Sequence, residues 1–134
     1  DALPEGAIAT PHEGELAAME RAFGLSGAGA KWQRAQALAQ ASGLVILAKG
    51  PDSLIAAPDG RLLCAARAPS WLSVAGSGDV LAGCVAARLA AGEDAFAAAA
   101  TALWLHGEAA RLAGGPFTAG QLAGMVRAAY RTAL

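Results

Sequence analysis

Along this chain, short apolar runs alternate with longer stretches in which apolar residues return at every third or fourth position. A short uninterrupted apolar run is typical of a buried parallel strand, and the longer spacing is typical of a helix packed on one face. The pattern therefore predicts an α/β domain. The expected strands are residues 7–10 and 44–48, and the expected helices are 14–23, 31–41, 79–91, 95–112 and 119–133.

Turn and cap residues mark the ends of several of these elements. Gly43 stands where a helix C-terminus needs a left-handed residue, and Thr118 stands where a helix needs an N-cap. Pro58-Asp59-Gly60 separates two further apolar runs, 53–57 and 61–65, and predicts an antiparallel hairpin at the edge of the sheet. No linker, repeat or charge block divides residues 1–134, so we expect one domain, or part of one.

Composition excludes several classes of protein. The 134 residues are 55% hydrophobic and 16% charged, which favours a soluble globular protein with a core. A formal net charge of −1, with Lys and Arg scattered singly, argues against a nucleic-acid partner. We see no signal peptide and no membrane span, so a cytoplasmic protein is expected. Cys64 and Cys84 lack metal-ligand spacing, which predicts two reduced, buried thiols and no structural zinc.

The most informative segment is Gly76-Ser77-Gly78-Asp79, where a loop turns into a helix. The glycines allow successive backbone N–H groups to converge, and the positive end of the helix dipole favours a phosphate or an oxyanion at that point. The same field favours ionised Asp79, which suits a general base. The alternative interpretation is a simple cap, in which Ser77 or Asp79 satisfies free amides of the helix.

A second candidate site follows the expected strand 44–48. Lys49-Gly50-Pro51-Asp52-Ser53 comes directly after that strand, where α/β proteins bind ligands. Lys49 is placed to reach a phosphate, Gly50 permits close approach of the main chain, and Ser53 offers a hydroxyl. A polar surface loop is the alternative.

Each of the two histidines has two interpretations. His12 lies in Thr10-Pro11-His12-Glu13-Gly14-Glu15, a turn that would hold its ring in a cleft, although a lone histidine here is more often a surface or capping residue. His106 lies inside an expected helix, and we expect a packed or hydrogen-bonded core histidine, with a catalytic histidine as the alternative.

In this order and spacing, these segments resemble the ribokinase-like family of ADP- or ATP-dependent NAD(P)H-hydrate dehydratases. A small departure is Glu13, where the family often has Pro. Family domains are roughly twice as long, so the resemblance implies the C-terminal half of a three-layer α/β/α domain, beginning in mid-domain near Asp1-Ala2-Leu3. The matching segments are Thr10-Pro11-His12-Glu13-Gly14-Glu15, Leu47-Ala48-Lys49-Gly50-Pro51-Asp52-Ser53, Gly76-Ser77-Gly78-Asp79-Val80-Leu81-Ala82-Gly83 and, more weakly, Leu105-His106-Gly107.

The resemblance also implies a reaction, namely dehydration of hydrated NADH or NADPH driven by ADP or ATP. It implies that Asp79 is the catalytic base and contacts the hydrate, and that His12 helps to bind the hydrate. The amides of Gly76, Ser77 and Gly78 would stabilise phosphoryl charge. The adenine nucleotide would be bound by Lys49, Gly50, Pro51, Asp52, Ser53 and Gly78. Mg²⁺ would accompany the phosphates of the nucleotide, without a dedicated protein cage for the ion.

Two other functions stay open from the sequence. A small-molecule kinase for a sugar or vitamin precursor is one, because such kinases share the Gly-x-Gly-Asp motif and its catalytic Asp. The length also permits an inactive half-domain that serves as a binding module. As partners we expect a second copy of the chain, or the N-terminal half of the domain, because a sheet that is cut through its middle leaves a strand edge unpaired.

Overall fold

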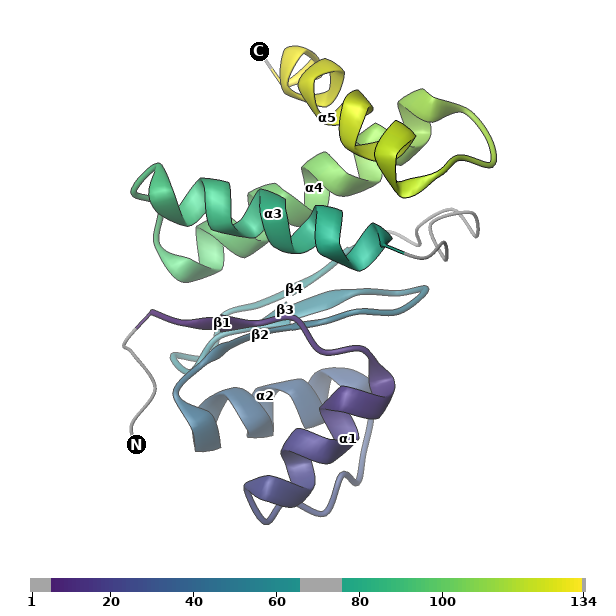
Figure 1. Ribbon diagram of the computed structural model, residues 1–134. Helices are drawn as coiled ribbons and strands as arrows, with labels where there is room; N and C mark the ends of the chain where they lie inside the picture. Colours follow the sequence, from purple (N-terminus) through teal and green to yellow (C-terminus); the bar gives the residue numbers. More distant parts are fainter. Residues whose placement is uncertain (1–5, 66–75, 134) are drawn as a thin grey trace.

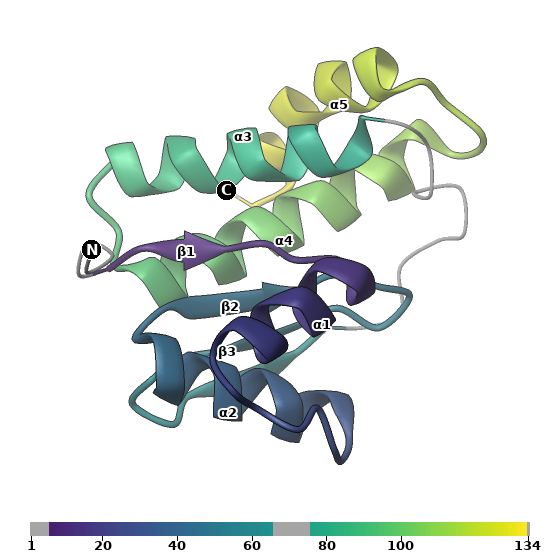
Figure 2. The same cartoon turned by 60° about the horizontal axis from the view of Figure 1, so that its bottom comes forward.

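The computed structural model describes residues 6–65 and 76–133. A four-stranded sheet lies between two helical layers, with α1 and α2 on one face and α3 and α4 on the other (Figures 1 and 2). Helix α5 packs on α4 and α3, away from the sheet. This layering confirms the predicted α/β class. The elements are β1 (Ile8–Ala9), α1 (Glu13–Ala22), α2 (Lys31–Ser42), β2 (Val45–Ala48), β3 (Leu54–Ala56), β4 (Leu62–Cys64), α3 (Ser77–Ala90), α4 (Ala95–Ala113) and α5 (Ala119–Thr132).

The strands follow one another across the sheet in the order β1-β2-β3-β4. Strand β1 runs parallel to β2, with Ile8 opposite Val45, whereas β2, β3 and β4 pair antiparallel. The parallel strand and the hairpin at the sheet edge are thus confirmed. Gly60 closes the hairpin turn with φ +97°, a left-handed conformation that favours glycine.

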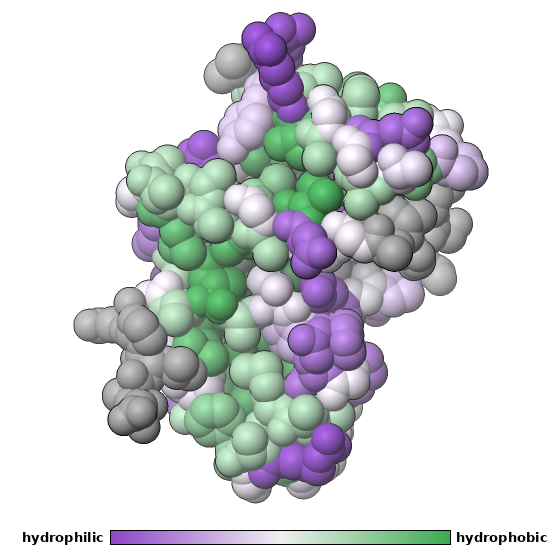
Figure 3. Space-filling view, in the orientation of Figure 1, coloured by the Kyte–Doolittle hydropathy of each residue, from purple (hydrophilic) through white to green (hydrophobic). Residues whose placement is uncertain are grey.

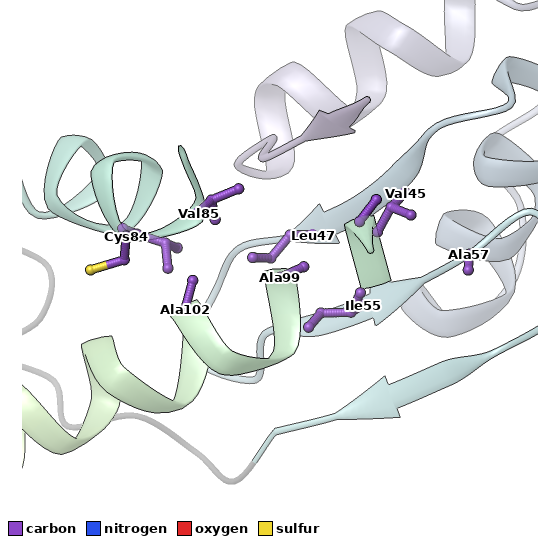
Figure 4. Packing of buried hydrophobic residues seen from close by; sticks show 10 residues of the cluster. Val45, Leu47, Ile55, Ala57, Cys84, Val85, Ala99 and Ala102 are labelled. Carbon is purple, nitrogen blue, oxygen red and sulfur yellow. The ribbon is translucent and has the colours of Figure 1, made fainter. Parts of the chain in front are cut away.

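Strand β2 is buried on both faces, as its uninterrupted apolar run predicts. Its side chains alternate: Val45 and Leu47 join the core beneath α3 and α4, and Ile46 joins the core beneath α1 and α2. Figure 4 shows Leu47 beside Ala99, with Cys84 and Val85 of α3 in the same cluster. The strand is therefore fixed from both sides, and so is the direction in which the chain leaves it.

Alanine side chains make close contact possible between α4 and the elements that pack on it. Helix α4 buries five alanines completely, and a methyl side chain lets neighbouring backbones approach each other. The buried alanines are Ala98, Ala99, Ala102, Ala109 and Ala110.

None of the helices in the described part of the chain combines the length and the apolar character needed to cross a bilayer.

A buried ion pair joins α1 to α2. Glu20 is only 3% exposed, and its two carboxylate oxygens accept hydrogen bonds from Nε and Nη2 of Arg34 at 2.8 and 2.9 Å. Arg34 also donates to the exposed Glu13 at 2.7 Å. Hydrogen bonds to the two carboxylates raise the pKa of Arg34 further above its ordinary value. The guanidinium thus ties both the first and the last turn of α1 to α2.

One sequence prediction is wrong: Cys64 is exposed, whereas Cys84 is buried as expected, and both thiols are free. The reason is the position of Cys64 in β4, the last strand of the sheet, all three residues of which are exposed. Cys84 instead faces the core from α3. Burial in these apolar surroundings raises the pKa of the Cys84 thiol, which keeps it protonated and unreactive.

Strand β1 lies at the other edge of the sheet described here. Its Ile8 is partly buried against the core cluster that β2 shares with α3. Figure 3 shows hydrophobic atoms gathered on the flank of the molecule where β1 and the end of α3 lie, and hydrophilic atoms on the opposite flank, where α1 begins. An apolar flank beside an open strand edge is a surface suited to pairing with further chain.

Candidate functional site

The first turn of α3 forms the centre of the candidate site. Gly76 is its N-cap with φ +85°, and a side chain there would both strain the backbone and lie 3.0 Å from the Cβ of Ala119. Neither Ser77 nor Asp79 is therefore the N-cap residue. The helix begins at Ser77, two positions before the predicted start, which places Asp79 in the first turn with its side chain exposed.

Lys49 leaves the end of β2 and reaches this turn. A Cβ added to Gly78 would lie 3.1 Å from Nζ of Lys49, so the ammonium lies against the backbone of Gly78. The amide of Lys49 donates a hydrogen bond of 2.9 Å to the carbonyl of Pro11, just beyond β1. The start of α3 therefore lies at the carboxyl ends of the parallel strands β1 and β2, as the sequence predicts.

The loop at residues 49–53 is held in shape by two side chains. The hydroxyl of Ser53 donates to the carbonyl of Gly50 and accepts from its amide, at 3.1 and 3.2 Å. Lys31, the first residue of α2, donates from Nζ to the carbonyls of Asp52 and Lys49, at 3.1 and 3.4 Å. Lys31 is a residue that the sequence analysis missed. No local signal identifies it, because its partners lie 18 and 21 residues away in the sequence.

His12 caps α1. Its Nδ1 accepts a hydrogen bond from the amide of Glu15 at 3.2 Å, and a carboxylate oxygen of Glu15 accepts one from the amide of His12 at 3.2 Å. Nε2 of the ring lies 3.0 Å from the same carboxylate oxygen. The capping interpretation is thus confirmed, and the binding interpretation is compatible with it, since the His12 side chain stays 64% exposed. The bond from Lys49 to Pro11 places this turn beside the loop.

His106 of α4 contacts the first turn of α3 from the core side. The ring is buried in α4, and its Nε2 lies 2.9 Å from the carbonyl oxygen of Ser77. Burial and the charge of nearby Lys49 lower the pKa of His106, although the bond to Ser77 opposes this effect. The prediction of a hydrogen-bonded core histidine is therefore confirmed.

The chemistry of these groups suits an anion close to a carboxylate. The ammonium of Lys49 and the first-turn amides of α3 attract negative charge, while exposed Asp79 stands next to Gly78 and can accept a proton from a bound molecule. Residues 6–65 and 76–133 contain no group of three or more His, Cys, Asp or Glu side chains placed to hold a metal ion.

Comparisons with known proteins identify the family of this chain. Residues 2–128 match the model of a family described as NAD(P)H-hydrate dehydratase. The chain is 36% identical over 129 residues to an ADP-dependent (S)-NAD(P)H-hydrate dehydratase of Neisseria meningitidis, covering 92% of this chain and 43% of that protein. It is also 37% identical over 105 residues to a bifunctional NAD(P)H-hydrate repair enzyme of Mycobacterium leprae, covering 78% of this chain and 22% of the relative.

A solved structure has the same fold. The ADP/ATP-dependent NAD(P)H-hydrate dehydratase of Bacillus subtilis, co-crystallised with ATP and Mg²⁺, superimposes with a TM-score of 0.82 at 26% identity, over 98% of this chain and 50% of that one. The chain thus spans about half the length of this structure and less than half of the two sequence relatives. Together, the match over residues 2–128 and the shared fold show that the chain belongs to the NAD(P)H-hydrate dehydratase family.

Proposed function

We propose that this chain provides the nucleotide-binding and proton-transfer part of an enzyme that dehydrates (S)-NAD(P)H hydrate to NAD(P)H at the expense of ADP or ATP. The observation that carries the proposal is the position of Lys49, whose Nζ lies against Gly78 and therefore one residue from Asp79. A cation for phosphate thus lies at the helix turn that also carries the Asp79 carboxylate, and an attack of a hydroxyl on a phosphoryl group needs both groups.

The nucleotide is proposed to lie along the loop that follows β2. Lys49 would pair with a phosphate, and the exposed backbone of Gly50, Pro51 and Asp52 would contact the nucleotide. Ser53 is proposed to act mainly by closing the loop, because both its hydrogen bonds go to Gly50. The amides of Gly76, Ser77 and Gly78 would stabilise the charge of the transferred phosphoryl group.

The reaction itself needs a leaving group better than hydroxide. In the proposed sequence, the hydroxyl oxygen of the hydrate attacks the terminal phosphorus of ADP or ATP, and Asp79 takes the hydroxyl proton. The bridging P–O bond of the nucleotide breaks at the same time, and AMP or ADP leaves with the bonding electron pair. The C–O bond then breaks, phosphate leaves with the electron pair, and loss of a proton from the neighbouring carbon forms the ring double bond. Asp79 suits the first step because its carboxylate is exposed at the positive end of α3.

His12 is proposed to contact the hydrated dinucleotide. Its Nδ1 is engaged as the cap of α1, so the ring can offer the substrate only its Nε2 edge. Glu15 competes for that edge from 3.0 Å. Substrate binding at His12 would therefore displace or share the Glu15 carboxylate while the cap at Nδ1 stays in place.

Mg²⁺ is proposed to accompany the nucleotide. Oxygen ligands suit this ion, and the donor set described above includes backbone carbonyls and single carboxylates but no cluster of acidic side chains. The residues therefore fit an ion held chiefly by the phosphates. When bound, it would neutralise phosphate charge during transfer.

The strand edge and the thiols bear on partners and location. The open edge of β1 supports pairing with the part of the domain that the longer relatives possess, or with a second copy of this chain. The two free thiols suit a reducing compartment, and we propose the cytoplasm. Light scattering of the purified protein tests the first point, since a monomer with no tendency to associate at high concentration would contradict pairing through β1.

A direct assay tests the activity. Purified protein is incubated with hydrated NADH and with ADP or ATP, and recovery of the reduced-nicotinamide absorbance is followed. Recovery that depends on the nucleotide is expected. In a parallel assay with ATP and a panel of sugars and vitamin precursors, a phosphorylated product without recovery of NADH would favour a small-molecule kinase. Absence of both reactions would leave a binding module as the function.

A further inference from the structure

His106 is the buried polar side chain that faces the candidate site from within the core. It is 8% exposed, it lies in α4, and its Nε2 is 2.9 Å from the carbonyl oxygen of Ser77, 29 residues earlier. A carbonyl oxygen only accepts hydrogen bonds, so Nε2 must carry the proton and donate it. The contact therefore fixes the tautomer of His106 and links α4 to the first turn of α3.

The accepting carbonyl belongs to the peptide unit that carries the N–H of Gly78. Among the described residues there is no cis peptide bond, so the C=O of Ser77 and the N–H of Gly78 point in opposite directions within one rigid plane. An amide in the first turn of a helix has no acceptor within that helix. A bond that fixes the carbonyl of Ser77 therefore also fixes the direction in which the amide of Gly78 presents its hydrogen.

Lys49 lies against the same glycine. Its Nζ is the atom that a Cβ on Gly78 would approach to 3.1 Å. The peptide thus has a donor from the core on its carbonyl and a half-buried cation beside its glycine. Burial and the positive charge of Lys49 both disfavour a second proton on His106, which keeps the imidazole a neutral donor.

We propose that His106 is a positioning residue for phosphate binding: its Nε2–H orients the Ser77–Gly78 peptide so that the amide of Gly78 faces the phosphate beside Lys49. This inference rests on the proposed function, because it assigns the phosphate to an adenine nucleotide. It goes beyond that function because it gives a buried residue of α4 an influence on the affinity of the protein for ADP.

Three substitutions separate this role from simple packing. His106→Gln places an amide nitrogen at about the position of Nε2 and keeps a donor, whereas His106→Asn is too short to reach Ser77. Leu105→Ala removes an adjacent core side chain that is 1% exposed and leaves His106 intact. His106→Leu, without a donor but with an apolar side chain, replaces the Asn variant if that variant does not fold.

The measurements are ADP titration by calorimetry, thermal melting, and the amide signal of Gly78 in protein labelled with ¹⁵N-glycine. This signal is assigned by its loss in Gly78→Ala. We expect His106→Asn to weaken ADP binding about fivefold, the effect of one lost hydrogen bond, and to shift the Gly78 signal. His106→Gln should stay within about twofold of the wild type, and Leu105→Ala should lower the melting temperature without changing the affinity of the folded protein.

Two results would overturn the inference: His106→Asn that binds ADP as the wild type does with an unmoved Gly78 signal, or a Gln variant as weak as the Asn variant. A wild-type protein that does not bind ADP would instead contradict the proposed function. The Gly78 signal tests the orientation of the peptide in either case, so the two failures can be told apart.

Discussion

Lys49 and Gly78 meet where β2 ends and α3 begins, so closely that a Cβ on Gly78 would lie 3.1 Å from the lysine Nζ. Lys49 is carried there by a strand that is buried on both faces, and Gly78 by a helix that packs on the same sheet. The absence of a side chain at Gly78 leaves room for the ammonium and for any anion that it binds. This relationship makes Gly78 a sensitive position for testing the site.

Gly78→Ala should therefore weaken ADP binding without loss of stability. The new methyl group displaces the flexible end of Lys49 and occupies the anion position, so we expect affinity to fall about tenfold, as for one charge-assisted contact. Alanine is favoured over glycine in a helix by up to about 1 kcal/mol, so stability should be unchanged or higher. Calorimetric titration and urea unfolding measure the two effects.

Gly83→Ala in the same helix is the matched control. No atom of the described residues lies within 4 Å of its added Cβ, so this variant should gain the same helix propensity and keep the affinity for ADP. Equal affinities of the Gly78 and Gly83 variants would mean that the first turn of α3 does not contact the nucleotide.

Lys49→Met should act on binding more than on turnover. Methionine keeps the length of the stem, but the cation is lost, so we expect the KM for ADP to rise about tenfold and kcat to change much less. Because salt screens the lysine charge, added salt should raise the KM of the wild type more than that of the variant. A fall in kcat at unchanged KM would instead assign Lys49 to the chemical step.

Local sequence patterns predict much of this site. The apolar run before Lys49, the glycines at 76 and 78 and the cap at Thr118 each act within a few residues, where strand, turn and helix preferences decide the outcome. Because the carboxyl ends of the parallel strands β1 and β2 lie at one sheet edge, their order in the chain also predicts that the motifs meet.

What the sequence does not predict are contacts that depend on how a helix is rotated on its neighbour. Lys31 reaches the carbonyls of Lys49 and Asp52, and His106 reaches that of Ser77, only because the packing of whole helices turns these side chains toward the loops. The prediction that Cys64 is buried is wrong for a related reason. An apolar run does not reveal whether any layer covers the strand that it forms, and β4 lies at the uncovered edge.

Arg34→Met should destabilise the fold by about 3–5 kcal/mol, because it leaves the buried carboxylate of Glu20 without a partner. Glu13→Gln, which removes only the exposed partner of the same guanidinium, should cost less than about 1 kcal/mol. The double variant Glu20→Leu with Arg34→Met should recover much of the loss. Urea unfolding measures all three, and equal losses for the two single substitutions would contradict the assignment of Glu20 as the decisive partner.

Because the pKa of His106 is lowered in the folded protein, we expect the free energy of unfolding to decrease as the pH is lowered. Its ordinary pKa is 6.5, and burial, with a smaller effect of Lys49, lowers the value in the folded protein. The unfolded chain therefore binds the proton first, so the contribution is fully present above about pH 6.5 and is lost as the pH falls toward the lower folded value. The groups that act on the ring are the carbonyl of Ser77, which favours the proton, and Lys49, which opposes it.

His106→Gln isolates this effect, because glutamine does not titrate while His12 and the carboxylates stay the same. The difference in unfolding free energy between wild type and variant, measured in urea at several pH values from 7.5 to 5, should change in favour of the variant as the pH falls. A difference that is constant with pH would contradict the lowered pKa.

Asp79→Asn tests the proton transfer. Asparagine keeps the shape of the side chain but cannot take a proton at neutral pH, so dehydration should slow by about 10²–10⁴-fold. Since Gly76 is the N-cap and the Asp79 side chain is exposed, stability should change by less than about 1 kcal/mol.

Asp94→Asn provides the control, since Asp94 caps α4, which begins at the opposite end of the helical layer from the start of α3 (Figure 1). Asparagine is as good a cap as aspartate, so this variant should keep both activity and stability. If Asp79→Asn lost stability and its folded fraction still turned over hydrate at the normal rate, Asp79 would serve the helix and not the reaction. Steady-state kinetics and thermal melting, with and without ADP, distinguish these outcomes.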